Sequence, residues 1–313
     1  MSVSRLDMTR SAVRRQGDAR RPVLARRSAI KALGILVVAI VMGAIPVPRA
    51  SDGALDRYDL EAGIVANELS RGLDEVSGLA FDGQGRLWAH DDERARVYQL
   101  DPSSGDVLAH FDVARGVAGD WEGIAWAEGN LFLVDSDGVL VRFVPGGHGE
   151  GVEYLRIDTG LGSRCEIEGL GFEPSRRALL LGCKTARERE LRDRMVVLAF
   201  SLATMSGEEV PRVSIPATVL GSFGFSAREF RVSAVETHPR TGTILVASAQ
   251  SAAIMEVSPD GRTVVGGRVP GNRLLRQLEG LAVAPDGALV LASEASGRRA
   301  ILARVPLGPE GDR

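Results

Sequence analysis

Short apolar runs alternate with turns rich in Gly, Pro, Asp and Ser from residue 58 to residue 307. Within many runs, apolar residues alternate with small or polar ones, which is the pattern of half-buried β-strands. The runs fall into groups of four. Four short strands joined by tight turns form one antiparallel sheet. The pattern therefore predicts an all-β fold made of several small sheets.

One phrase opens each group of strands. It reads Glu122-Gly-Ile-Ala-Trp126 and returns at residues 168–172 and 279–283, with weaker copies at 77–81 and 233–237. Its second position, the anchor, is Gly in four copies and Ala in one. The anchors lie at 78, 123, 169, 234 and 280, so they are 45, 46, 65 and 46 residues apart. A period of about 40–45 residues built from short strands is typical of a β-propeller blade.

Five groups predict a β-propeller of five four-stranded blades over residues 58–307. The fifth group is one strand short, and the stretch 58–69 precedes the first group. We predict that this stretch is a strand of the last blade, because pairing the chain ends closes the ring and hides the sheet edges. Six blades is the alternative, if the long third repeat holds a degenerate blade. The polar segment 185–194 in that repeat is expected to be a solvated loop or helical turn.

Residues 1–50 are predicted to be a targeting segment. They carry ten Arg and Lys against two Asp, followed by an uncharged apolar run over 32–47. That run is shorter than the roughly 20 residues of a membrane span. The sequence Ala25-Arg26-Arg27-Ser28-Ala29-Ile30-Lys31 resembles a twin-arginine export signal, apart from Ala25 and Ala29. We expect a bacterial protein exported to the periplasm. The alternative is an uncleaved signal peptide that anchors the protein in the inner membrane, facing outward.

The rest of the chain is acidic and has few cysteines. The whole chain has a net charge of −3 and residues 1–50 have +8, which leaves −11 for the remainder. Such a body argues against binding nucleic acid and suits cations or cationic partners. Residues 51–57 are expected to be a polar lead-in and 308–313 a tail. Cys165 and Cys183 could pair in an oxidising compartment, or remain two thiols in a packed blade.

A set of carboxylates is predicted to gather at one end of the central channel. Propeller strands alternate in direction, so the start of each first strand and the end of each second strand lie on the same face. Clustered carboxylates repel unless a cation neutralises them, and Ca²⁺ takes six to eight oxygen ligands. We therefore predict a Ca²⁺ site here. Its candidate ligands are Glu122, Asp135, Glu168, Glu279 and Glu294. Alternatively, the Glu before each Gly only accepts hydrogen bonds from the backbone of the next blade.

The same face carries further charged residues that could bind a ligand. They are Asp91, Asp92, Lys184 and Arg231. Lys184 and Arg231 could bind an anionic group, or only pair with the carboxylates. The sequence has no HExxH, GxSxG, Walker or dinucleotide-binding motif.

Four phrases resemble one known family. They are Gly78-Leu-Ala-Phe-Asp82, Asp120-Trp-Glu-Gly-Ile-Ala125, Val232-Ser-Ala-Val-Glu-Thr-His-Pro239 and Leu278-Glu-Gly-Leu-Ala-Val-Ala-Pro-Asp-Gly287. They are similar to the SdiA-regulated family of exported bacterial β-propellers. Related phrases occur in phytase-like esterase domains and gluconolactonase-type propellers. The resemblance implies a propeller in the periplasm or on the outer face of the membrane, with Ca²⁺ as a candidate cofactor. It gives no catalytic residues.

Two functions follow from these observations. The first is a propeller that binds a small molecule or protein partner through its acidic mouth without catalysis. It has no nucleic-acid partner, and it contacts a membrane only through an uncleaved N-terminal segment. The alternative is a cation-dependent hydrolase of phosphoester or lactone type, in which the metal activates water.

Overall fold

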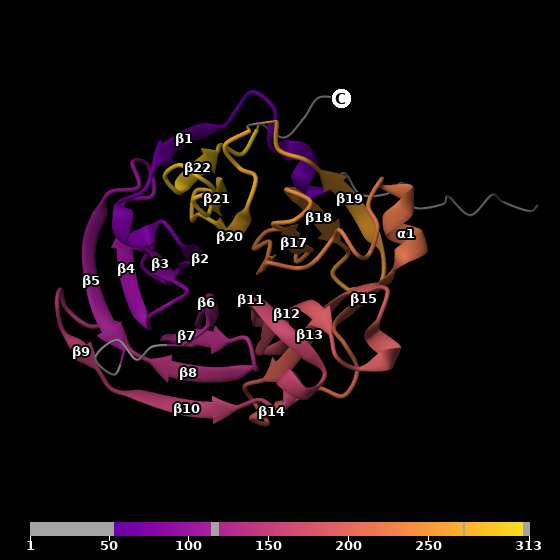
Figure 1. Ribbon diagram of the computed structural model, residues 1–313, viewed down its shortest axis with the longest axis horizontal. Coiled ribbons are helices and arrows are strands. Elements are labelled where there is room, and N and C mark those ends of the chain that lie inside the picture. Colours follow the sequence, from indigo (N-terminus) through magenta and orange to yellow (C-terminus); the bar gives the residue numbers. More distant parts are fainter. Residues whose placement is uncertain (1–52, 114–118, 272, 309–313) are drawn as a thin grey trace, which may run out of the picture. The chain divides into compact units, whose positions relative to one another are not determined.

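The computed structural model describes residues 53–308 apart from 114–118 and 272. The predicted targeting segment lies outside these residues. The described strands form five sheets arranged in a ring, with the first strand of each sheet nearest the centre (Figure 1). The prediction of an all-β propeller with five blades is confirmed. Within the described part of the chain, no helix is long and apolar enough to cross a bilayer.

Each blade is built mainly from strands that follow one another along the chain, with β9 in blade 1 and β1 in blade 5 as the exceptions. Blade 1 contains β2 (Val76–Phe81), β3 (Leu87–Asp91), β4 (Arg96–Leu100), β5 (Val107–Val113) and the short β9 (Gly151–Val152). Blade 2 contains β6 (Trp121–Ala127), β7 (Asn130–Asp135), β8 (Val139–Phe143) and β10 (Tyr154–Asp158). Blade 3 contains β11 (Cys165–Glu173), β12 (Ala178–Ala186), β13 (Arg194–Ser201), β14 (Ser206–Gly207) and β15 (Val213–Pro216).

The last two blades complete the ring. Blade 4 contains β16 (Ala234–Thr237), β17 (Ile244–Ser248), β18 (Ala253–Val257) and β19 (Val264–Arg268). Blade 5 contains β20 (Leu278–Val283), β21 (Leu289–Ser293), β22 (Ile301–Val305) and, from the other end of the propeller, β1 (Val65–Glu68).

The N-terminal strand closes blade 5, as predicted. β1 pairs antiparallel with β22, with Val65 opposite Arg304 and Glu68 opposite Ile301. The prediction of one continuous strand over residues 58–69 is wrong. Asp59 starts a turn instead, because its Oδ1 accepts hydrogen bonds from the backbone N–H groups of Glu61 and Ala62.

A second contact fixes the N-terminus to blade 4. The short 3-10 helix η1 (Ala54–Arg57) precedes β1. The backbone N–H groups of Ala54 and Leu55 donate to the two carboxylate oxygens of Glu256, at 2.8 and 2.9 Å. Glu256 lies on β18 and is fully buried. We expected residues 54–57 only to lead into the propeller. They instead contact blade 4 just before the chain enters blade 5 as β1.

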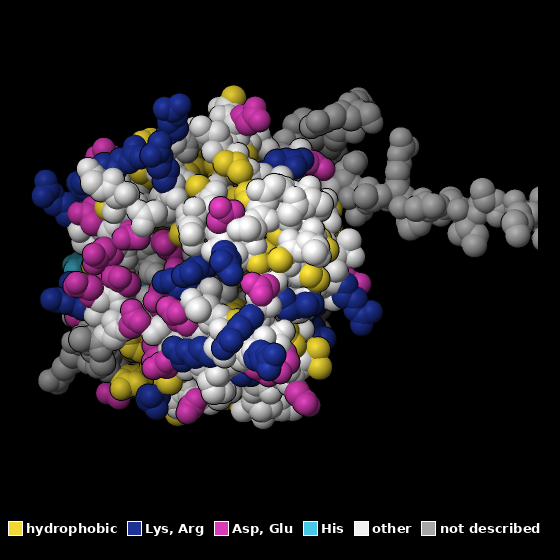
Figure 2. Space-filling model, turned by 45° about the vertical axis from the view of Figure 1, so that its right-hand side comes forward, with side chains coloured by type: hydrophobic (Ala, Val, Ile, Leu, Met, Phe, Trp, Pro, Cys, Tyr) yellow, Lys and Arg dark blue, Asp and Glu magenta, His cyan; other side chains and the backbone are white. Residues whose placement is uncertain are grey.

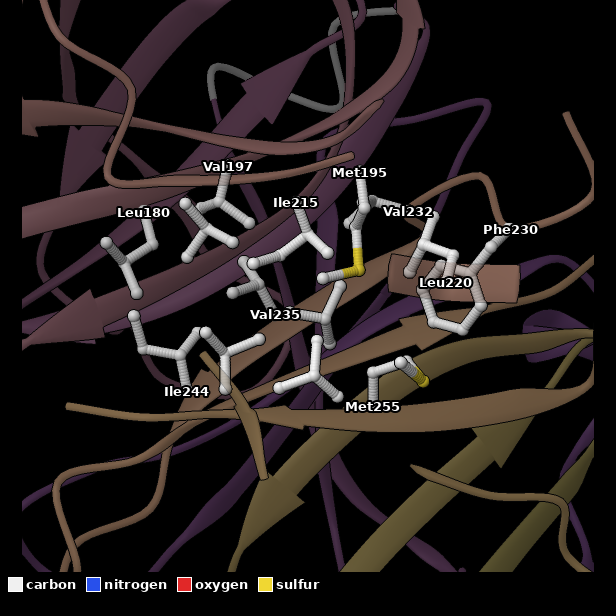
Figure 3. Close-up of a cluster of buried hydrophobic side chains, with 14 of the residues drawn as sticks. Leu180, Met195, Val197, Ile215, Leu220, Phe230, Val232, Val235, Ile244 and Met255 are labelled. Atoms are coloured by element: carbon white, nitrogen blue, oxygen red, sulfur yellow. The ribbon is translucent and has the colours of Figure 1, made fainter. Parts of the chain in front are cut away.

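The interfaces between blades form the core. The described residues form five clusters of buried apolar side chains, one between each pair of adjacent blades. In the cluster between blades 3 and 4, the side chains of Leu180 and Ile244 point toward one another (Figure 3). Leu220 from helix α1 (Ala217–Ser222) and Phe230 extend this cluster. The long third repeat thus adds α1 to the interface between blades 3 and 4 and the 3-10 turn η5 (Arg189–Leu191) to the interface between blades 2 and 3, where Leu191 is buried, and it adds no sixth blade.

Close approach of the first strands explains the anchor glycines. Neighbouring first strands contact each other around the axis. A Cβ on Gly123 would lie 2.5 Å from the backbone nitrogen of Leu170. A Cβ on Gly169 would lie 2.8 Å from the Cα of Ala234, and Gly169 also has a φ of +90°. Only glycine fits where the neighbouring backbone is this near.

Candidate functional site

The Glu-Gly phrase is a β-bulge. In blade 2, Trp121 pairs with Asp135 and Gly123 with Val134, so Glu122 has no partner in the ladder. Ser77 and Glu279 occupy the same position in blades 1 and 5, and the register also shifts at Glu168 in blade 3. A bulge bends its strand and re-aims a side chain. It therefore frees these residues from the alternation that would otherwise direct them into a blade interface.

Two of the bulged carboxyl groups meet. Glu168 is hydrogen-bonded to Glu279, and its Oε2 also lies 2.9 Å from Nζ of Lys184. These Glu residues come from blades 3 and 5, which flank blade 4 in the ring. Blade 4 carries the smaller Ser233 at this position, whose hydroxyl donates to the backbone oxygen of Leu278. The small side chain leaves room for the two longer ones to meet.

The surroundings of this pair favour a proton on Glu279. Burial and the charge of Glu168 raise the pKa of Glu279 to about 10. This shift favours the protonated form of Glu279, which can donate a hydrogen bond to Glu168. Burial and the charge of Glu168 also raise the pKa of Glu122 to about 8. Although partial burial acts to lower it, the charges of Glu168 and Glu122 leave the pKa of Lys184 above its usual value.

Some carboxylate oxygens in this group have no partner. Glu279 is buried, with 9% of its surface exposed. Its Oε2 makes no hydrogen bond within the described part of the chain. Oδ1 of Asp92 is also buried without a partner there. Burial and the charge of Glu75 raise the pKa of Asp92 to about 6. Burial and Glu75 likewise raise the pKa of Glu294. Negative charge at this mouth exceeds what Lys184 neutralises.

The structure brings together most of the predicted site residues. We call this group the acidic mouth; it consists of Asp92, Glu122, Glu168, Lys184, Glu279 and Glu294, whose charges act on one another. Asp135 is not part of it, because its Oδ1 accepts backbone hydrogen bonds from Asp137 and Val139 in its own turn. Arg231 is exposed and forms no ion pair with any described residue.

Two roles were expected for the Glu residues of the acidic mouth: binding Ca²⁺, or accepting backbone hydrogen bonds from the next blade. In the described chain, no backbone N–H donates to Glu122, Glu168 or Glu279, so they do not join blades through such bonds. Nor do three or more described His, Cys, Asp or Glu side chains form a group that could hold a metal ion. A Ca²⁺ ion would have to displace the Glu279 proton and move Lys184. Ca²⁺ binding therefore stays a prediction.

The channel below the acidic mouth is almost closed. Residues of all five first strands line a cavity of about 10 Å³, with Glu279 in its wall. This is about the space that one water molecule needs. A ligand therefore has access to the carboxylates from the mouth and not through the channel.

A disulfide bond supports the position of Lys184. Cys165 in β11 and Cys183 in β12 are bonded, which settles the choice that the sequence left open. Cys183 directly precedes Lys184, and Cys165 lies three residues before Glu168. The bond therefore joins the two strands that carry the ion pair.

A larger pocket lies beside the acidic mouth, between blades 5 and 1. It has a volume of about 370 Å³, and its wall includes Arg71, Glu75, Asp91 and Arg94. Asp91, one of the predicted ligand-binding residues, therefore lines this pocket. The repeated phrase does not mark Arg71 and Arg94, because Arg71 begins the short 3-10 helix η2 (Arg71–Leu73) and Arg94 lies in the loop between β3 and β4. Figure 2 shows acidic side chains gathered over one part of a face, with Lys and Arg side chains bordering them.

Several proteins of known structure have a similar fold. Glutaminyl cyclase from Myxococcus xanthus superposes with a TM-score of 0.54 at 15% identity, over 78% of this chain and 96% of that protein. The PQQ-bound aldose sugar dehydrogenase from Streptomyces coelicolor has a TM-score of 0.51 at 15% identity, over 77% and 98%. At this identity the likeness shows the fold alone. No curated protein matches the sequence.

The sequence also matches one protein family. Residues 53–296, nearly the whole propeller, match the SdiA-regulated family. The match agrees with the resemblance carried by the repeated phrases and with the observed β-propeller. The chain therefore belongs to the SdiA-regulated family.

Proposed function

We propose that this propeller is a binding protein whose acidic mouth takes a cationic group of its ligand. The observation that carries the proposal is the buried Oε2 of Glu279, which has no partner in the described chain. A buried polar atom without a hydrogen bond is unfavourable and points to a missing ligand. Burial and the charge of Glu168 favour a proton on Glu279. A bound cation would replace that proton and use both oxygens of Glu279.

An ammonium group suits the acidic mouth better than a metal ion. Nζ of Lys184 at 2.9 Å from Glu168 shows that a carboxylate here already binds an ammonium group. An ammonium donates three hydrogen bonds and needs no fixed set of ligands. No described group of carboxylates is arranged for a metal ion. We therefore take an organic ammonium ion as the first candidate and Ca²⁺, predicted from the sequence, as the second.

We prefer binding to catalysis. A cation-dependent hydrolase needs a metal with an open coordination position and a base beside it. No contact in the described residues favours that arrangement. The proposal that the protein acts outside the cytoplasm rests on the N-terminal sequence, which lies outside the described residues.

Thermal unfolding with added cations tests this function. A ligand that binds only the folded protein stabilises it by RT ln(1 + [L]/Kd), about 2.7 kcal/mol at a hundred times Kd. We expect butylammonium to raise the melting temperature of the wild type and to do so much less for Glu279→Gln. Glu153→Gln is the matched control, because Glu153 is exposed and lies outside the acidic mouth. Ca²⁺ is titrated in parallel after chelation. A wild type that responds to neither cation would contradict the proposed function.

A further inference from the structure

The pocket between blades 5 and 1 adjoins the acidic mouth. Glu75 lies in the pocket wall, and its charge acts on both Asp92 and Glu294 of the acidic mouth. Asp91 and Ala295, also in the wall, are the sequence neighbours of Asp92 and Glu294. The backbone N–H of Asp92 donates to the oxygen of Glu75. One ligand could therefore reach both regions.

Two arginines in the pocket have uncommitted guanidinium groups. Arg71 and Arg94 are exposed, and neither side chain forms an ion pair or hydrogen bond with a described residue. The other arginine of the wall, Arg96, is already bound to Asp112 at 2.6 Å. Asp74 in the wall is likewise paired, with Arg299. The pocket thus offers two guanidinium groups among the carboxylates of Glu75, Asp91 and Glu93. It adjoins the acidic mouth through Glu75.

We infer that the ligand is a small zwitterion, with its ammonium group in the acidic mouth and a carboxylate group bound by Arg71 and Arg94. Guanidinium groups match the planar geometry of a carboxylate and bind it with paired hydrogen bonds. The pocket volume of about 370 Å³ lies within the range of small-molecule sites. The nearby charges of Asp91 and Glu75 disfavour a ligand that is only anionic. This inference rests on the proposed function and adds the second charged group.

The test compares ligands that carry one charge or both. Binding is measured by isothermal titration with butylammonium, with butyrate, and with straight-chain ω-amino acids from glycine to 6-aminohexanoate. The amino-acid series covers a range of separations between the two charges. We expect one or more of the ω-amino acids to bind about tenfold more tightly than butylammonium, as one or two charge-assisted hydrogen bonds would give. Butyrate alone is expected to bind weakly.

Variants assign the effect to the two arginines. Arg71→Ala with Arg94→Ala should lower the affinity for the best ω-amino acid to that for butylammonium, and should not weaken butylammonium binding. Arg228→Ala with Arg262→Ala removes the same charge from exposed positions outside the pocket and should change neither. Equal wild-type affinity for butylammonium and every ω-amino acid would overturn this inference alone. So would an unchanged ω-amino acid affinity in the pocket variant. Absence of butylammonium binding to the wild type would overturn the proposed function as well.

Discussion

Glu168 and Glu279 come from two blades that are not neighbours, yet their carboxyl groups are hydrogen-bonded to each other at the channel mouth. Both residues are bulged at the start of a first strand, and Ser233 of the intervening blade is small enough to let them meet. Burial and the charge of Glu168 raise the pKa of Glu279, and Lys184 neutralises only one of the two carboxylates. The raised pKa of Glu279 therefore depends on a residue from another blade and not on blade 5 alone.

Protonated carboxyl groups make the stability depend on pH. Burial raises the pKa of Glu122 and Glu236 to about 8 and, with the charge of Glu168, that of Glu279 to about 10. Between pH 4.5, where an unfolded Glu titrates, and about 8, the folded protein binds more protons than the unfolded chain. These groups make the free energy of unfolding fall as pH rises. Burial lowers the pKa of His90 and His238, which opposes this trend below about pH 6.5, so we expect the fall most clearly above pH 7. Denaturant unfolding from pH 5 to pH 9 measures this slope.

Glu279→Gln should make that slope shallower. The amide keeps a donor for Glu168 and has no charge to bury. We expect the variant to exceed the wild type in stability at pH 8 by on the order of 1 kcal/mol or more, and to gain little at pH 5. Glu153→Gln, at an exposed position, should leave the slope unchanged. Stability of the wild type that rises from pH 5 to pH 8 would contradict this account.

Gly123→Ala should destabilise the propeller by about 1–3 kcal/mol. Its Cβ would lie 2.5 Å from the nitrogen of Leu170, a backbone atom that cannot move without shifting β11. Gly266→Ala is the control, because a Cβ there meets nothing within 4 Å and the position does not require a positive φ. We expect this control to be neutral or slightly stabilising. Equal melting temperatures for the two variants would show that the first strands are not packed this closely.

Glu256→Ala should loosen the N-terminal closure. It leaves the backbone N–H groups of Ala54 and Leu55 buried without acceptors, at a cost on the order of 2–4 kcal/mol. Hydrogen exchange should then show faster exchange at Ala54 and Leu55 than at strands of blade 2. Glu68→Ala, on the exposed end of β1, provides the comparison. If Glu256→Ala unfolds with the same midpoint as Glu68→Ala, the carboxylate is not what fixes the N-terminus.

Replacing Arg26 and Arg27 with Lys should block export. Twin-arginine export reads the paired arginines, and lysine keeps the charge without the guanidinium groups. Fractionation of cells that produce each form measures the protein outside the cytoplasm. Replacement of Arg20 and Arg21 is the matched control and should have no effect. Recovery of the Arg26/Arg27 variant in the periplasm at the wild-type level would rule out this route.

The sequence was sufficient to predict the propeller, because the repeated phrase marks the first strand of every blade. It also placed Glu122, Glu168 and Glu279 on one face, since strand direction alone determines that. It failed at residues 58–69, where the side chain of Asp59 competes with the strand by capping a turn. Local hydrogen bonds of this kind are not visible in an apolar pattern.

Other features of the site depend on three-dimensional packing. The bulges at Glu122 and Glu279 arise from the register between two strands, which the phrase does not specify. The shared proton depends on the burial of Glu279 and its distance from a residue in another blade. Arg71 and Arg94 lie in loops that follow no repeat, so no pattern marked them. A search for Arg and Lys in the segments before each first strand and after each second strand could have found them.

Proton release during cation binding tests the central claim most directly. If a cation replaces the proton between Glu168 and Glu279, butylammonium binding at pH 7 must release about one proton. Titration in two buffers of different ionisation enthalpy measures this number, since the observed heat then differs between the buffers. We expect release of about one proton from the wild type and clearly less from Glu279→Gln. Binding with the same heat in both buffers, or equal proton release from the two proteins, would show that the cation does not bind at this pair.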